Sequence, residues 1–346
     1  MNFQTASFGK ERLLALDLLR TVAALIVAVG HSGALFPRYS DITYTMCVAF
    51  FFVLSGFVIS HAYGDEISHE QLTLRNYAAL RFARLYPLHF LTAVVVVILY
   101  FAGRRATGIS LLWIFENLTV SQSLITYGWS LNLPAWSIGP EVWGSFLIFA
   151  LYSFRGPMHF SLICTTAAVF LFFEFSAGFL QSITERYLIG LGCFLLGFAA
   201  HRGVIDIIAS RIPSSIGWGL AATAFAATIF CPYSIARTPP AELGFYALFT
   251  LTVAVLARVR MAGLMADVAN ASGNISYGVY LWHWPLLLVF RPFSHLGLAV
   301  FVTVLIAISW ISYVAFERPA KRYFRRLLST PRGGLRNEPA LNEIAS

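Results

Sequence analysis

The segment LDLLRTVAALIVAVGH (Leu16–His31) has the apolar composition of a membrane-spanning helix, yet it carries Asp17, Arg20 and His31. Ionisable side chains inside spans are costly and usually face the interior of a bundle. Asp17 and Arg20 are three residues apart and are therefore neighbours on one helix face. Arg20 and His31 are eleven apart, so they share that face at a separation of about 16 Å along the axis. The segment predicts a span with a fixed cation at one end and a titratable imidazole near the other.

The composition places this segment in a membrane protein. Of the 346 residues, 58% are hydrophobic and 12% are charged, against about 25% charged in soluble domains. The formal charge of +8 does not indicate nucleic-acid binding, because the basic residues lie in short loops and in FERPAKRYFRRLL (316–328), as topology determinants do. The cysteines lie in apolar runs without ligand spacing, which favours unpaired thiols and no metal site. They are Cys47, Cys164, Cys193 and Cys231.

The hydropathy pattern predicts an all-α integral membrane protein, a bundle of about ten transmembrane helices of roughly 20 residues each. An amphipathic segment at 111–128 is re-entrant, interfacial or an eleventh span. With ten spans the basic residues concentrate on the side of the N-terminus, so both termini are expected in the cytoplasm. We expect a transmembrane domain over 11–322, a short basic cytoplasmic tail over 323–346, and a first span that is retained rather than cleaved. The expected spans are 13–35, 44–62, 86–102, 138–155, 158–175, 187–201, 214–231, 242–257, 275–291 and 296–316.

Two arginines precede the expected third span, in NYAALRFARLYP (76–87). Arg81 and Arg84 are three residues apart and face the same way on a helix. Positive side chains at this place often only anchor the topology. They also suit a phosphate clamp at the cytoplasmic mouth, because guanidinium groups bind phosphate through paired hydrogen bonds.

Two further stretches carry polar groups into the bundle. WSLNLPAWSIGPEVW (129–143) is expected on the outer side and leads into Glu141. Its tryptophans are typical of an interfacial aromatic belt, although aromatic, amide and hydroxyl groups also suit a sugar. GNISYGVYLWHWPLLLVF (273–290) places His283 three and six residues after Tyr280 and Tyr277. Taken alone, this histidine is more typical of a satisfied structural site than of a catalytic one.

Taken in order over about residues 11–322, these stretches resemble the membrane-bound acyltransferase family 3, the integral-membrane O-acyltransferases. The first segment carries the family's Arg–ten residues–His pattern on Arg20 and His31. Where the family often has a second acidic residue after its motif Glu, this chain has Val142. The other matching stretches are FFVLSGFVIS (51–60), RFARLYP with its Arg-x-x-Arg, LPAWSIGPEVW, ISYGVYLWHWP and FERPAKR.

The resemblance implies roles for individual residues. His31 would be catalytic, with Glu141 orienting its imidazole, and Arg20, Arg81 and Arg84 would bind the acyl donor. No metal is implied. Structural or substrate-positioning roles fall on Asp17, Ser55, Gly56, Trp136, Ser137, Tyr277, His283 and Glu317.

The activity that the resemblance implies is transfer of an acyl group, most often acetyl, from cytoplasmic acyl-CoA to a hydroxyl of an extracytoplasmic acceptor such as a polysaccharide or oligosaccharide. Acyl-CoA would be a substrate rather than a resident cofactor, and the chain would lie in the bacterial cytoplasmic (inner) membrane. Two chemistries are open for His31: general base for the acceptor, which we prefer, or nucleophile forming an acyl-imidazole. The competing function is a glycan transporter or flippase without acyl transfer, since intramembrane charges fit that class as well.

Overall fold

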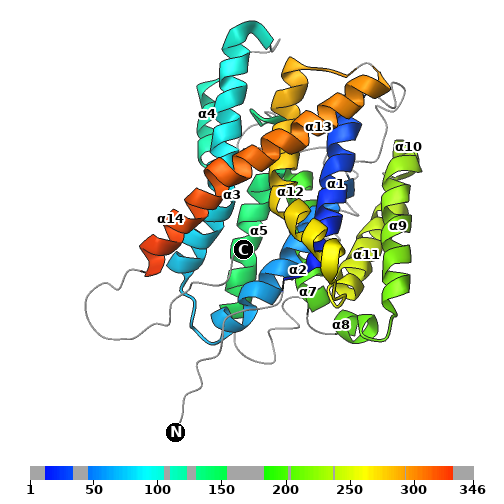
Figure 1. Ribbon diagram of the computed structural model, residues 1–346. Helices are drawn as coiled ribbons and strands as arrows, with labels where there is room; N and C mark the ends of the chain where they lie inside the picture. The colour runs from blue at the N-terminus through cyan, green and yellow to red at the C-terminus, as the bar shows by residue number, and fades with distance from the viewer. Residues whose placement is uncertain are drawn as a thin grey trace, which may run out of the picture.

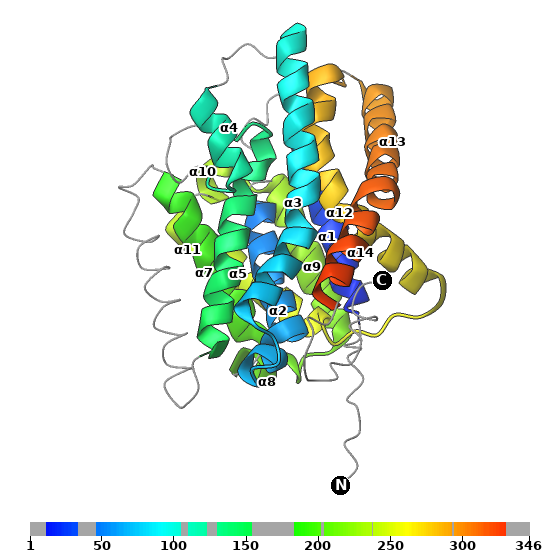
Figure 2. The ribbon, with the colours of Figure 1, turned by 90° about the vertical axis from the view of Figure 1, so that its left-hand side faces the viewer.

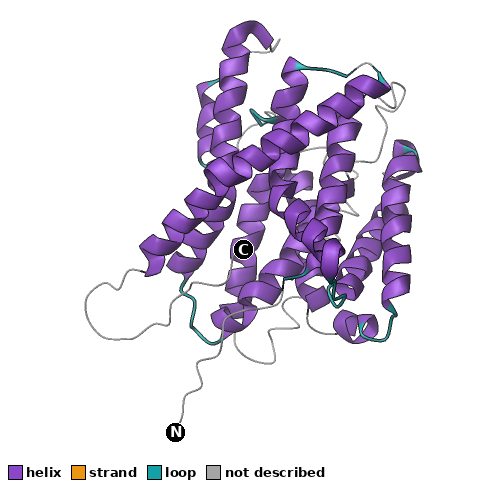
Figure 3. Cartoon of the chain, viewed as in Figure 1, coloured by secondary structure: helices purple, strands orange, loops and turns teal. Residues whose placement is uncertain are grey.

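The computed structural model describes residues 12–33, 46–104, 110–122, 130–153, 183–201, 204–236, 238–292 and 294–329. Within these residues the chain is helical and contains no strand, which confirms the all-α prediction for the described part (Figures 1 and 3). The expected span at 158–175 and Cys164 lie outside the described residues.

Among the described residues, four helical stretches are long and apolar enough to cross a membrane: Leu14–Ser32, Met46–Ser68, Leu74–Gly103 and His295–Phe324. The elements are α1 (Leu14–Ser32), α2 (Met46–Ser68), α3 (Leu74–Leu99), the π-helical turn η2 (Tyr100–Arg104), α4 (Leu111–Leu118), the 3₁₀ turn η3 (Leu133–Ser137), α5 (Ile138–Ser153), α7 (Ile183–His201), α8 (Val204–Ala209), α9 (Ser214–Phe230), α10 (Tyr233–Ala236), α11 (Pro239–Leu256), α12 (Gly263–Val289), α13 (His295–Ser312), the π-helical turn η4 (Tyr313–Glu317) and α14 (Arg318–Ser329).

Two helices begin well before the spans expected for them. α3 starts at Leu74, where the Thr73 side chain accepts a hydrogen bond from the Asn76 N–H at 3.3 Å, and α12 starts at Gly263. A hydropathy profile detects only the apolar part of a helix. A helix can begin earlier, in polar residues whose side chains have partners inside the bundle. Of the segment 111–128 the structure describes residues 111–122, which contain the eight-residue helix α4. This helix is far shorter than the roughly 20 residues that a spanning helix needs.

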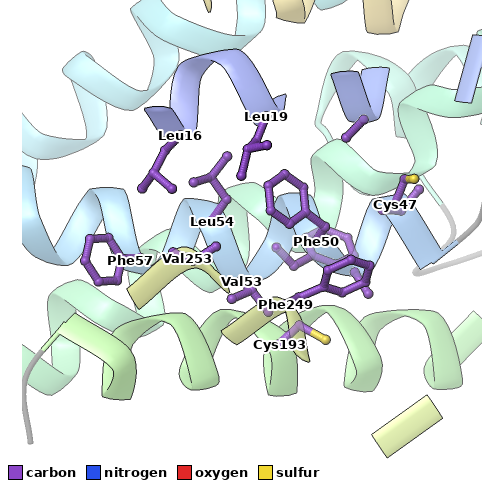
Figure 4. Close-up of a cluster of buried hydrophobic side chains, with 14 of the residues drawn as sticks. Leu16, Leu19, Cys47, Phe50, Val53, Leu54, Phe57, Cys193, Phe249 and Val253 are labelled. Carbon is purple, nitrogen blue, oxygen red and sulfur yellow. The ribbon is translucent and has the colours of Figure 1, made fainter. Parts of the chain in front are cut away.

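The apolar core surrounds α2, which packs against α7, α5, α11 and α1. Figure 4 shows Leu16 and Leu19 of α1 facing α2, with Phe249 and Val253 of α11 on another side. Close packing of this kind fills the interior with contacts between interlocking side chains.

Two glycines bring α2 and α7 into backbone contact. A Cβ at Gly56 would overlap the carbonyl oxygen of Phe194, and a Cβ at Gly197 would overlap that of Val53. Small residues at such crossings let membrane helices approach closely. Gly56 therefore lies at a helix crossing between α2 and α7.

The last helices form a slanted rod at the edge of the bundle. In Figure 1, α13 and α14 cross the front of the molecule, and Figure 2 shows them beside α3 and α12. Most of α13 is exposed on its outer side, as expected for a helix that faces lipid. The π-helical turn η4 joins the two helices and places Glu317 inside, where it is 2% exposed.

Candidate active site

A charged cluster ties the start of α1 to α12. The Arg20 guanidinium lies 3.3 Å from the Asp17 carboxylate, and Arg12 lies 2.5 Å from the same carboxylate. Arg12 also donates hydrogen bonds to Asn270 and to Asn274 of α12. α12 approaches this closely at Gly273, where a Cβ would lie 2.5 Å from the Asp17 Cβ. Asp17 thus holds two arginines, one of which, Arg12, was not anticipated from the sequence.

Glu141 pairs with Arg81. The two side chains approach to 3.2 Å and are largely buried, and Ser55 donates a hydrogen bond to the same carboxylate oxygen at 3.3 Å. Among the described residues, none of the polar contacts of Glu141 is to His31, so the expected direct orientation of that imidazole by Glu141 is not present.

The Arg81–Glu141 pair joins residues that the sequence assigned to opposite halves of the membrane. Because α3 begins at Leu74, Arg81 lies about two turns after the start of the helix. Glu141 stands in the first turn of α5, which follows the buried turn η3 within the bundle. Both helices therefore deliver their charges to the interior, where a partner compensates each of them.

Arg84 and Glu317 complete this region. Glu317 is buried, and neither of its carboxylate oxygens has a hydrogen-bond partner among the described residues. Arg84 is half-buried and acts electrostatically on Glu317, on Arg20 and on Tyr277. The Tyr277 hydroxyl donates to the Leu85 carbonyl at 2.8 Å. In the described part of the chain Arg84 makes no hydrogen bond or ion pair, unlike Arg20 and Arg81.

His31 lies in the last turn of α1. The helix ends at Ser32 and is followed by Gly33, whose φ of 66° is a left-handed conformation that favours glycine. His31 Nδ1 lies 3.0 Å from the Val27 carbonyl oxygen, and because a carbonyl only accepts, Nδ1 carries the proton. The basic lone pair of the neutral imidazole is therefore on Nε2.

Two aromatic rings of α12 flank His31. The His283 ring is stacked on it, with centroids 5.0 Å apart and planes 26° apart. Trp284 meets it edge to face at 6.0 Å. His283 is fully buried and also contacts the Tyr280 ring at 6.0 Å. The structure thus joins His31 and His283, which are far apart in the sequence.

The turn η3 is bound to α12 next to these rings. Tyr280 donates to the Pro134 carbonyl at 2.9 Å, and its hydroxyl lies 3.0 Å from the Ser137 hydroxyl. Asn132 donates through Nδ2 to the Leu281 carbonyl at 2.9 Å. That carbonyl lacks its usual partner because Pro285, four residues later, has no N–H.

Neither Asn132 nor Tyr280 was assigned a role from the sequence, although Tyr280 was noted for its spacing from His283. Pro285 was the available signal for Asn132, because a proline at this position leaves the Leu281 carbonyl in need of another donor. Trp136, which was singled out, packs edge to face on Phe52 at 6.2 Å.

No metal cluster is present among the side chains that the structure describes, as no group of three His, Cys, Asp or Glu residues is close enough to hold an ion. Cys47 is a buried free thiol. The arrangement is one of general acid–base and anion-binding groups, with a cationic region around Arg20 and Arg84 and an imidazole farther along α1.

Comparisons with known proteins identify a family and several related sequences. A family model described as "Acyltransferase domain" matches residues 13–317. "Putative peptidoglycan O-acetyltransferase YrhL" of Bacillus subtilis is 26% identical over 355 residues, covering 88% of this chain and 54% of that protein. "Peptidoglycan O-acetyltransferase OatA" of Listeria monocytogenes is 22% identical over 328 residues, covering 84% of this chain and 51% of that protein.

A third relative matches a shorter stretch. "Protein 2 in picA locus" of Rhizobium radiobacter is 42% identical over 99 residues, covering 29% of this chain and 51% of that protein. The chain spans about half the length of these curated relatives. No solved structure matches it.

Proposed function

The chain belongs to this acyltransferase family, and we propose from that premise that it transfers an acetyl group from cytoplasmic acetyl-CoA to a hydroxyl of an extracytoplasmic glycan. The names of the relatives favour peptidoglycan as the acceptor class. Acetyl-CoA is a substrate in this proposal and not a resident cofactor. No observation favours a transporter or flippase over acyl transfer.

One observation carries the proposal. α1 holds Arg20 near one end and His31 at the other, about 16 Å apart along the axis. Arginine binds phosphate but does not act as a base at neutral pH, whereas imidazole takes and returns protons near neutrality. An elongated donor with phosphates at one end and a reactive thioester at the other fits this separation of tasks.

Arg84 is the leading phosphate ligand in this proposal. Arg20 shares Asp17 with Arg12, and Arg81 is paired with Glu141. Within the described residues Arg84 has no such partner, so it binds an anion without first breaking an ion pair. Arg20 and Arg81 add positive potential to the same region and support the bound phosphates.

We propose His31 as the general base. The acceptor oxygen attacks the thioester carbonyl carbon while its proton passes to His31 Nε2. The new C–O bond forms, the C–S bond breaks, and the proton moves from His31 to the departing thiolate. The hydrogen bond from Nδ1 to the Val27 carbonyl supports this role because it fixes the tautomer that leaves Nε2 basic. Detection of an acetylated His31 after exposure to acetyl-CoA without acceptor would replace the base by a nucleophile.

The proposed topology places the donor inside the cell and the acceptor outside. Ten spans with both termini in the cytoplasm put the start of α1 on the cytoplasmic side, so Arg20 meets the donor phosphates and His31 meets the acceptor. The basic residues of α14 (Arg318–Ser329) support this orientation, because positive residues concentrate on the cytoplasmic side. The bacterial inner membrane is the location that this reaction requires.

The test uses the purified chain in lipid nanodiscs with radiolabelled acetyl-CoA and tetra-N-acetylchitotetraose, a soluble mimic of the peptidoglycan glycan strand. We expect labelled acetate on the sugar and its loss in His31→Ala. His69→Ala is the matched control, because His69 is an exposed histidine with the same type of bond to a carbonyl four residues earlier. Arg84→Gln should raise KM for acetyl-CoA about 10-fold or more, the loss of one charge-assisted hydrogen bond. Equal transfer by wild type and His31→Ala would refute the proposal.

A further inference from the structure

We propose that His283 is a positioning residue for acyl transfer, whose ring stabilises the imidazolium formed when His31 takes the proton of the acceptor. This inference rests on the proposed function and gives His283 a specific task, beyond the general structural or substrate-positioning role that the resemblance implies. His283 comes from α12 and is fully buried. It therefore acts on His31 rather than on solvent.

The geometry of the two rings supports this task. Their centroids are 5.0 Å apart and their planes are 26° apart, which lies in the range of offset stacking. A cation within about 6 Å of an aromatic centroid is attracted to the face of that ring, and the attraction is stronger when water is excluded. The positive charge that develops on His31 thus meets an aromatic face that is already in place.

Two further contacts hold His31 in this orientation. Nδ1 donates to the Val27 carbonyl, and Trp284 meets the ring edge to face. The last turn of a helix carries partial negative charge on its free carbonyls, which also favours an imidazolium there. Protonation at Nε2 therefore produces a cation whose ring is fixed against His283.

His283 itself is suited to remain uncharged during the reaction. Among the described residues, neither of its ring nitrogens has a partner of normal hydrogen-bond geometry, although the Val279 and Tyr280 carbonyls of its own helix approach it. Burying a charge without a partner is costly. The proton taken from the acceptor consequently stays on His31, and His283 contributes the face of its ring.

The alternative role for His283 is a hydrogen bond from one of its nitrogens to the substrate. Two substitutions separate the roles. His283→Phe keeps an aromatic face and removes both nitrogens, whereas His283→Gln keeps an N–H close to the position of Nε2 and removes the ring. Incorporation of 2-thienylalanine at position 283 adds a five-membered aromatic ring without nitrogen, so the comparison stands if the larger Phe disturbs folding.

With tetra-N-acetylchitotetraose and acetyl-CoA, we expect kcat of the Phe or thienylalanine protein to stay within about 5-fold of wild type. We expect kcat of His283→Gln to fall about 10- to 30-fold, the loss of one desolvated cation–π contact. KM for acetyl-CoA should not change, because His283 lies away from the proposed phosphate ligands. The reverse order, with Gln active and the aromatic variants inactive, would overturn the proposal, as would equal kcat in all variants.

Controls distinguish this inference from the proposed function. His69→Phe and His69→Gln, made at an exposed histidine, should match wild type in kcat. If wild type transfers no acetyl group, or if His31→Ala retains full transfer, the proposed function fails. If His31→Ala abolishes transfer while the His283 series shows no dependence on the aromatic face, only the present inference fails.

Discussion

Replacing Gly56 with alanine is expected to push α2 and α7 apart and to lower the stability of the protein. The added Cβ would overlap the carbonyl oxygen of Phe194 on α7. The reverse contact is equally tight, since a Cβ at Gly197 would overlap the Val53 carbonyl oxygen and lie 2.8 Å from the Phe57 nitrogen. The atoms concerned belong to the backbone, so no side-chain rotation relieves the overlap.

The cost follows from these distances. A carbon normally stays at least about 3.3 Å from a carbonyl oxygen, so the helices have to separate by about 1 Å. Overpacking of this kind in a filled core costs about 1–3 kcal/mol, which corresponds to a fall of about 2–8 °C in melting temperature. One separation makes room for both added methyl groups, so Gly56→Ala with Gly197→Ala should cost less than the sum of the two single changes.

Thermal unfolding of the purified protein in detergent, followed by tryptophan fluorescence, measures this effect. Gly219→Ala in α9 is the matched control, because a Cβ there meets no atom within 4 Å. It should be neutral or slightly stabilising, as alanine is a better helix former than glycine by about 1 kcal/mol. A Gly56→Ala protein that melts at the wild-type temperature, or fully additive effects of the two glycines, would refute the reasoning.

Two further predictions concern polar contacts. Asn132→Ala leaves the Leu281 carbonyl without a donor and should lower the free energy of unfolding by about 1–3 kcal/mol. In a Pro285→Ala background residue 285 regains its N–H, so the same change should cost less. An equal loss of melting temperature in both backgrounds would contradict this prediction. Arg81→Gln leaves Glu141 largely buried without its cation and should cost about 3–5 kcal/mol. The double variant with Glu141→Gln should recover part of that stability, and a double variant as unstable as the sum of both single changes would speak against the pair.

The sequence was informative about helices and about contacts within one helix. Hydropathy located α1 and the start of α2 to within a few residues, although α2 continues six residues beyond its expected end. The helical repeat predicted that Asp17 and Arg20 would be neighbours, as the 3.3 Å contact shows. Both inferences depend only on local periodicity. The early start of α3 was missed, because hydropathy cannot register that Arg81 has a buried partner on another helix.

Contacts between helices were much harder to predict from the sequence. The partner of Glu141 is determined by the burial of η3, the turn that precedes α5. The sequence of this stretch predicts only a polar outer loop. The stacking of His31 on His283 likewise depends on the close approach of α1 and α12 at Gly273, which only the three-dimensional structure reveals. The need for a donor such as Asn132 could have been predicted, because a proline inside a helix leaves the carbonyl four residues earlier without its helical N–H partner.

The polar first half of α12 has a practical consequence for topology mapping. Hydropathy assigns residues 263–274 to a loop, which would make them an obvious site for an epitope, a protease site or a reporter fusion. They instead form the opening turns of a continuous helix that binds Arg12 through Asn270 and Asn274. An insertion there would break the element that carries His283 and would report on a damaged protein, whereas an insertion in the non-helical stretch 259–262 just before it would interrupt no helix.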